Sequence, residues 1–143
     1  MARSIEREIR VEASPEVVYE VISSPEHLRE WWPDDADLEA VPGATGTVSF
    51  GDDKVVPLTV TEADPPRRFA FRWAYDGDVA TLENSLLVTF DLVPSAGGTL
   101  LRFAESGYDE AAKPDEMYED HTRGWDYFLP RLTTYVDRLV SSS

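Results

Sequence analysis

The chain has 143 residues, of which 42% are hydrophobic and 29% are charged, and this composition is typical of a folded globular protein rather than a disordered one. Its 28 acidic residues outnumber its 13 basic residues, giving a formal net charge of −15. Because such a charge repels phosphate backbones and anionic lipids, we expect neither nucleic acid nor membrane as a partner. At this length we expect one domain spanning residues 1–143.

The sequence carries no cysteine, which excludes disulfides, thiolate metal sites and a cysteine nucleophile. The first residues, MARSIEREIR, are charged and lack the apolar segment of an export signal. No apolar run approaches the length needed to cross a bilayer. We therefore expect a cytoplasmic location, while monomer and homodimer both remain open.

The first part of the chain predicts a strand followed by two short helices. Residues 3–12 alternate loosely between polar and apolar side chains, as in a strand with one buried face. Ser-Pro-Glu then occurs twice, at residues 14–16 and 24–26. Serine caps helix starts, proline suits the first helical position, and glutamate complements the positive end of the helix dipole. A helix is therefore predicted to begin at each motif.

The middle of the chain predicts an antiparallel meander. The apolar period changes to two, interrupted by the turn sequences VPGATG, GDDK, ADPPRR, YDGD and PSAGG. Strands are expected near residues 46–50, 55–62, 67–75, 83–93 and 99–107, with a further one near residues 37–41. In the last of the main strands, Leu101, Phe103 and Glu105 share one face. Glu105 is thus a carboxylate in a row of large apolar side chains.

The last segment predicts one long amphipathic helix. Its apolar stripe, which includes one histidine, repeats at steps of three or four residues and consists of Met117, His121, Trp125, Phe128, Leu132, Val136 and Leu139. Gly124 removes a side chain beside Trp125. Pro130 lacks an amide hydrogen and is expected to bend the helix near residues 126–130.

The order of these elements favours an α+β fold. Crossover helices between the strands are missing, so a doubly wound parallel sheet is excluded. We predict a curved antiparallel sheet of six to seven strands wrapped around the C-terminal helix, with the two short helices after the first strand. A curved sheet that holds a single helix tends to leave a hollow between them.

Several segments resemble a known superfamily. ASPEVVYEVISSPEHLREWWP resembles the opening of START-like helix-grip proteins, the SRPBCC superfamily that includes the birch pollen allergen and polyketide cyclases. PPRRFAFRW, GGTLLRFAESGY and the later GW are similar to the branch named after the heat-shock-protein-90 ATPase activator. The resemblance covers residues 3–140 and implies a helix-grip fold. Members of the superfamily bind lipids, sterols or polyketides, catalyse cyclisation or hydrolysis, or act on protein partners.

We expect aromatic side chains to line the hollow, with Glu105 as the polar anchor of a ligand. The expected lining residues are Trp32, Phe50, Phe71, Trp73, Phe90, Phe103, Trp125 and Phe128. Trp31 and Trp32 are adjacent on a helix and so point about 100° apart. One is expected to pack in the core and the other to lie near the cavity mouth; alternatively, both pack the short helices onto the sheet.

Glu105 and His121 are the candidates for proton transfer. Glu105 is either a desolvated carboxylate inside the hollow, a partly exposed strand end, or the partner of an arginine such as Arg72. His121 is either an acid or base beside Glu105 or a hydrogen-bonded structural residue. His27 is expected on the surface.

The sequence lacks the motifs of metal, nucleophile and nucleotide sites. Two distant histidines do not make a metal site, there is no G-x-S-x-G, and no glycine-rich loop leads into a helix, so no metal and no cofactor are expected. Three functions remain open: binding of a small apolar ligand, a cyclase- or hydrolase-like reaction, and a protein-interaction role. The acidic segments at residues 34–39 and 108–116 suit a basic protein partner, although such runs are usually solvated surface.

Overall fold

The computed structural model describes the larger part of the chain, namely residues 4–51, 54–75, 80–81, 84–108, 111 and 113–141. Residues 52–53 of the predicted turn GDDK, residues 76–78 of YDGD, and residues 109, 110 and 112 of the acidic segment lie outside these ranges. Within the described part, no helix is long and apolar enough to cross a membrane.

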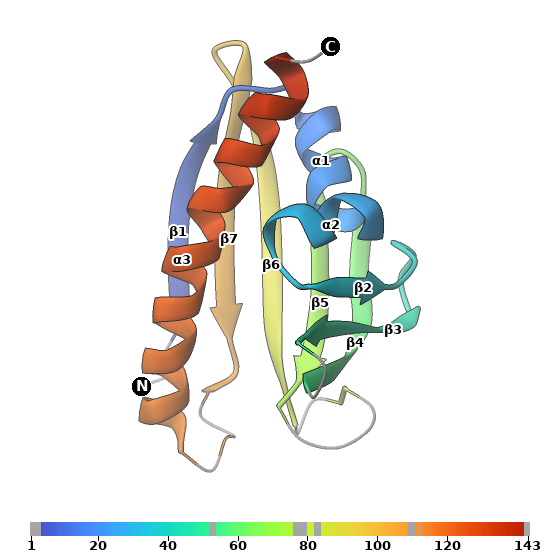
Figure 1. Cartoon of the computed structure of the whole chain (residues 1–143), viewed down its shortest axis with the longest axis vertical. Helices are drawn as coiled ribbons and strands as arrows, with labels where there is room; N and C mark the ends of the chain where they lie inside the picture. The colour runs from blue at the N-terminus through green and yellow to red at the C-terminus, as the bar shows by residue number, and fades with distance from the viewer. Residues whose placement is uncertain are drawn as a thin grey trace.

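The fold is α+β, and the described residues form one seven-stranded sheet in the order β1-β7-β6-β5-β4-β3-β2 with every neighbouring pair antiparallel. In Figure 1, β1, β7, β6 and β5 run along the long axis, whereas β2 and β3 run across it, so the sheet curls. The predicted helix-grip architecture is confirmed. The strands are β1 (Ser4–Val11), β2 (Asp35–Asp37), β3 (Thr45–Phe50), β4 (Lys54–Asp64), β5 (Arg68–Ala74), β6 (Ser85–Ser95) and β7 (Gly98–Ser106).

Two short helices follow β1, as predicted: α1 (Pro15–Ser23) and α2 (Pro25–Trp31). The Ser14 side chain accepts a hydrogen bond from the Val17 amide and caps α1. The same expectation for Ser24 is wrong, because its side chain makes no capping bond. Its backbone instead joins the two helices, since its N–H bonds to the Glu20 carbonyl and its carbonyl accepts from the Leu28 amide at 2.8 Å.

The additional strand expected near residues 37–41 is displaced toward the N-terminus. β2 covers Asp35–Asp37 and pairs with β3. The chain then turns away, and the Ala44 amide bonds to the Val41 carbonyl at 3.0 Å. Gly43 supplies the positive φ of +87° that this turn requires.

The long helix α3 (Pro114–Ser141) covers the inner face of the sheet and packs against β1, α1 and α2 (Figure 1). It is continuous through Pro130; a bend there stays a prediction. Its buried face is formed by Trp125, Leu129, Leu132 and Val136, of which Leu129 was absent from the predicted stripe.

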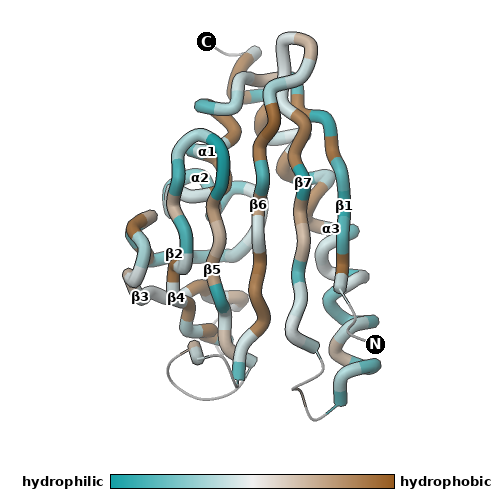
Figure 2. Tube along the Cα trace, turned by 180° about the vertical axis from the view of Figure 1, so that it is seen from behind, coloured by the Kyte–Doolittle hydropathy of each residue, from teal (hydrophilic) through white to brown (hydrophobic). Residues whose placement is uncertain are grey.

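The inner face of the sheet carries rows of apolar side chains across the strands. Figure 2, seen from behind, shows hydrophobic and hydrophilic residues alternating along β6. One row runs from β4 to β1 through Val60, Phe71, Val88, Glu105 and Ile5. A carboxylate therefore occupies the middle of an apolar row, which places Glu105 beneath α3 rather than at a free strand end.

Candidate functional site

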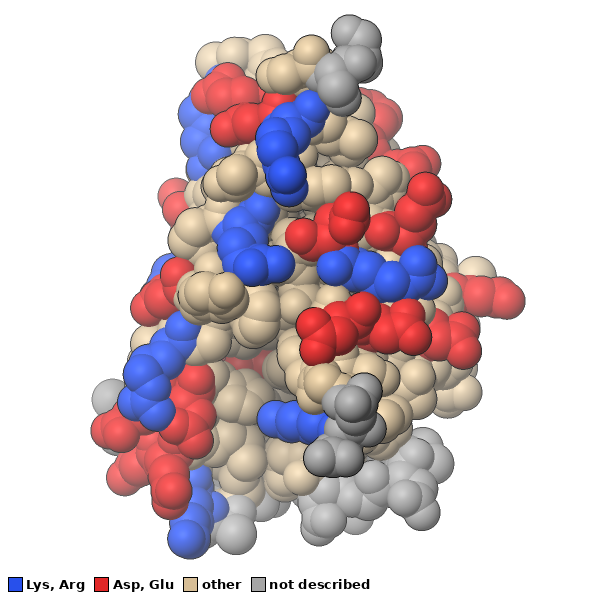
Figure 3. Space-filling view, viewed as in Figure 1, with Lys and Arg blue, Asp and Glu red and all other residues tan. Residues whose placement is uncertain are grey.

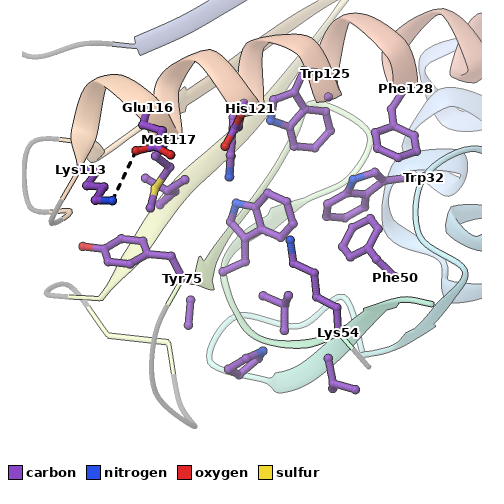
Figure 4. A pocket seen from close by; sticks show the side chains of 18 residues that line it. Trp32, Phe50, Lys54, Tyr75, Lys113, Glu116, Met117, His121, Trp125 and Phe128 are labelled. Atoms are coloured by element: carbon purple, nitrogen blue, oxygen red, sulfur yellow. Dashed lines mark ion pairs between the residues drawn. The ribbon is translucent and has the colours of Figure 1, made fainter. Parts of the chain in front are cut away.

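A pocket of about 770 Å³ opens between the first half of α3 and strands β3 to β5. This volume lies within the range of small-molecule sites. Figure 4 shows Trp32, Phe50, Trp125 and Phe128 around it, with His121 projecting from α3. In Figure 3 the same region is a hollow whose walls are mostly tan, with a basic side chain at its lower edge and acidic side chains gathered beside it over the start of α3.

The pocket lining includes part of the predicted aromatic set. Five aromatic residues of that set reach it: Trp32, Phe50, Trp73, Trp125 and Phe128. Three others do not line it, because their rings pack deeper in the core, where each is at most 2% exposed: Phe71, Phe90 and Phe103. The indoles cover them, with the Trp125 ring centre 4.6 Å from that of Phe103 and the Trp32 ring centre 5.6 Å from that of Phe71.

The two adjacent tryptophans have different surroundings. Trp31 is fully buried, donates its indole N–H to the Val21 carbonyl at 3.0 Å, and does not line the pocket. Trp32 lines it and is the centre of an aromatic cluster, with ring centres 5.1 Å from Trp73 and 5.2 Å from Trp125. The pair therefore joins the core of the short helices to one wall of the pocket.

Glu105 lies behind this wall and is 0% exposed. Its Oε2 accepts the Trp73 indole N–H at 2.7 Å. Its Oε1 accepts the Trp125 indole N–H at 2.9 Å, the Tyr108 hydroxyl, and a contact of 2.9 Å from His121 Nδ1. Four donors from three parts of the chain thus converge on one buried side chain, as buried charge requires.

Two of the alternatives considered for Glu105 are therefore wrong. It is neither an exposed strand end nor the partner of Arg72, whose guanidinium donates to the Ser85 hydroxyl at 3.1 Å. Arg72 alternates with Phe71 and Trp73 along β5 and so lies on the opposite face of the sheet. Glu105 is also absent from the pocket lining, because Trp73, Trp125 and His121 stand between its carboxylate and the opening.

Tyr108 is a member of this network that the sequence patterns did not reveal. It is fully buried, and burial, followed by the neighbouring Glu105 charge, raises its pKa well above the ordinary tyrosine value. The preceding residue, Gly107, has a φ of +107° and turns the chain so that Tyr108 folds back under β7. The signal in the sequence was the glycine two residues after Glu105, which predicts a reversal at the strand end.

His121 is brought beside Glu105, as the enzymatic hypothesis requires. Its side chain is 24% exposed and lines the pocket. An ionised carboxylate only accepts hydrogen bonds, so we assign the proton to Nδ1. Nε2 has no hydrogen bond to the described residues, so it can contact a molecule bound in the pocket. His27 is not simply at the surface as expected, since it is partly buried and its Nδ1 lies 2.6 Å from the Tyr135 hydroxyl.

The pocket also has charged residues that were not predicted. Lys54 at the start of β4, and Lys113, Glu116 and Asp120 at the start of α3, line it. No sequence period connects residue 54 with residue 113, so only the folded chain brings them together. Within the described ranges, no cluster of three metal-binding side chains occurs.

Comparison with known proteins identifies the family. The pattern of the family described as Activator of Hsp90 ATPase homolog 1-like protein matches residues 12–137. The chain belongs to this family. A comparison with curated protein sequences gave no match.

Several solved structures superpose over nearly the whole chain. Protein MLL2253 from Mesorhizobium loti is 23% identical with a TM-score of 0.84, covering 95% of this chain and 98% of that one. The Aha1 dimer from Colwellia psychrerythraea is 25% identical with a TM-score of 0.76, covering 94% and 96%. CalU16 from Micromonospora echinospora is 20% identical with a TM-score of 0.74, covering 99% and 80%. These likenesses confirm the fold.

Proposed function

We propose that this protein binds a small, largely apolar ligand in the pocket between α3 and the sheet. The observation that carries the proposal is the aromatic wall: Trp32, Phe50, Trp73, Trp125 and Phe128 border one hollow. Planar apolar molecules pack favourably on such surfaces. A polycyclic aromatic, a sterol or a lipid chain is the class of ligand that this wall suits.

The position of Gly124 supports the same function. It lies on the pocket-lining face of α3, one turn from both His121 and Phe128, and a Cβ built there meets nothing within 4 Å. Glycine inside a helix costs about 1 kcal/mol relative to alanine. The residue therefore keeps space open in the pocket at a cost to the helix.

Tryptophan fluorescence and thermal unfolding test the proposal with a panel of fatty acids, sterols and polycyclic aromatic compounds. Three of the four tryptophans line the pocket, so a bound ligand changes the emission. A ligand at about 100 times its Kd stabilises the folded state by about 2.7 kcal/mol, which raises the melting temperature by several degrees. Gly124→Phe places a phenyl ring on the pocket-lining face of α3, where a bound ligand would lie, and is expected to weaken both signals strongly.

Gly124→Ala is the matched control for that variant, since it adds a single methyl group to the same helix position and is expected to retain binding. If no compound of the panel changes the emission or the melting temperature of the wild-type protein, the ligand-binding proposal is wrong. Equal binding by wild type and Gly124→Phe would place the ligand elsewhere on the molecule.

A second candidate function is acid–base catalysis in the same pocket. It is favoured by the contact between His121 and Glu105, because a buried carboxylate on Nδ1 leaves Nε2 as a proton acceptor facing a bound molecule. Glu105 would act as a positioning residue, since it does not reach the pocket itself. A cyclase- or hydrolase-like reaction is the class that this pair suits, and hydrolysis of an ester is its simplest example.

Hydrolysis of nitrophenyl butyrate provides the test. We expect turnover above the buffer rate in the wild-type protein and its loss in His121→Gln, with binding of polycyclic compounds retained. Turnover that is unchanged in His121→Gln would contradict the catalytic role and leave the binding role standing.

A further inference from the structure

Both lysines of the chain lie at the pocket. The sequence contains only two, Lys54 and Lys113, and both line this hollow, whereas none of the arginines in the described part of the chain does. The net charge of −15 opposes anion binding over the molecule as a whole. A local preference for anions must therefore come from these two ammonium groups.

The other charged groups of the pocket already have partners. Lys113 Nζ lies 3.8 Å from Glu116 Oε2, and Asp120 forms an ion pair with Arg123. The buried carboxylate of Glu105 accepts its four hydrogen bonds from neighbouring side chains. Partnered charges of this kind contribute little net attraction for a further ion.

Lys54 differs from these groups. Its Nζ lies 5.9 Å from the centre of the Phe50 ring, in a cation–π contact, and it forms no ion pair with any residue that the structure describes. Figure 4 shows its side chain extending along the pocket wall beside Phe50. An aromatic surface and an ammonium group with no described carboxylate partner are thus adjacent in one pocket.

Resting on the proposed function, we propose that the ligand is an aromatic or amphipathic carboxylate whose apolar body packs against Trp32 and Phe50 and whose carboxylate binds Lys54. The apolar body supplies most of the affinity. The ion pair forms at a partly solvated site and sets the choice between anionic and neutral ligands.

Three pyrene compounds with the same ring system test the assignment: pyrenecarboxylate, pyrenemethanol and the pyrenemethylammonium cation. Energy transfer from the pocket tryptophans to pyrene reports binding. In the wild-type protein we expect the carboxylate to bind about threefold to fivefold more tightly than the alcohol, and the cation to bind more weakly than both. Lys54→Met keeps the apolar stem and is expected to remove this preference without weakening the alcohol.

Two control variants separate the local effect from net charge. Arg138→Gln removes one positive charge about 15 Å further along α3 than Phe128, from the helix rise per residue, and is expected to keep the preference. Lys113→Met removes an ammonium group that already has Glu116 as its partner, and it should reduce the preference by less than about twofold. A wild-type protein that binds carboxylate and alcohol equally, or a preference that persists in Lys54→Met, would overturn the assignment. Failure of all three pyrene compounds to bind would instead count against the proposed function.

Discussion

The buried carboxylate of Glu105 accepts four hydrogen bonds from other side chains. Its donors come from β5, from the turn after β7 and from α3, so a single carboxylate connects the sheet to the helix behind the pocket. Each donor would cost free energy if left buried without an acceptor. The network therefore fixes the orientation of the Trp73 and Trp125 rings that form the aromatic wall.

Glu105→Gln tests this role through stability. The amide group must direct its NH₂ at one of the existing donors, so at least one hydrogen bond is lost and two donors face each other. We expect a loss of about 1–3 kcal/mol in the free energy of unfolding, measured by urea denaturation. Glu8→Gln, on an exposed surface ion pair, is the control and should change stability by less than about 0.5 kcal/mol. Equal effects of the two substitutions would argue against a structural network.

Tyr108 predicts a dependence of stability on alkaline pH. Burial, and next the Glu105 charge, raise its folded-state pKa above the ordinary value of 10.0. The unfolded chain releases this proton above pH 10 while the folded chain retains it, so the stabilisation is complete below pH 10 and is lost as the pH rises further.

Denaturation across this pH range should show a shallower decline for Tyr108→Phe than for wild type. Burial also raises the pKa of Tyr19 and of Tyr135, and both residues are shared by the two proteins, so their contributions cancel. The tyrosinate absorbance of the folded wild-type protein should lack the Tyr108 signal. Identical slopes for the two proteins would contradict this account.

At the scale of elements, α3 has two functions on one face. Its C-terminal half is buried through Leu129, Leu132 and Val136, whereas its N-terminal half lines the pocket through His121 and Gly124. An ion pair of 2.9 Å between Arg7 of β1 and Asp126 lies near the change from one half to the other. The helix is therefore anchored at one end and borders open space at the other.

Gly124→Ala is expected to stabilise the protein by about 0.5–1 kcal/mol. The added methyl group meets no atom within 4 Å, so only the gain in helix propensity remains. Gly107→Ala provides the opposite case, because its φ is +107° and its Cβ would lie 3.2 Å from the Ser85 carbonyl; it should cost about 1–3 kcal/mol. Thermal unfolding of both variants measures the difference, and a destabilised Gly124→Ala would mean that the space beside this helix face is filled.

The elements were predictable where the signal was local. Alternation along β5 and β6 and the proline after each of Ser14 and Ser24 depend only on near neighbours in the chain, and the corresponding strands and helix starts were confirmed. The position of β2 depends on where the sheet curls, and the burial of Leu129 depends on which residues pack against α3. Neither can be inferred from a period in the sequence.

At the scale of the whole molecule, the candidate site was only partly predictable. Glu105 stood out as a carboxylate in an apolar row, and His121 as a histidine on an apolar stripe. Their contact could not be predicted, because it depends on how α3 lies over β7. Tyr108 and Lys54 were missed because the turn at Gly107 and the curl of β4 toward α3 bring them to the site. Fewer aromatic residues line the pocket than predicted, since Phe103 and Phe90 pack behind Trp125 rather than beside it.

The four tryptophan indole N–H signals in a proton–nitrogen correlation spectrum provide the most direct test of the pocket. Trp32, Trp73 and Trp125 line it, while Trp31 bonds to the Val21 carbonyl outside it. Titration with pyrenemethanol should shift the three pocket signals together, saturate at one equivalent, and leave the Trp31 signal in place. Shifts of all four signals alike, or of none while the compound binds, would contradict a ligand site between α3 and the sheet.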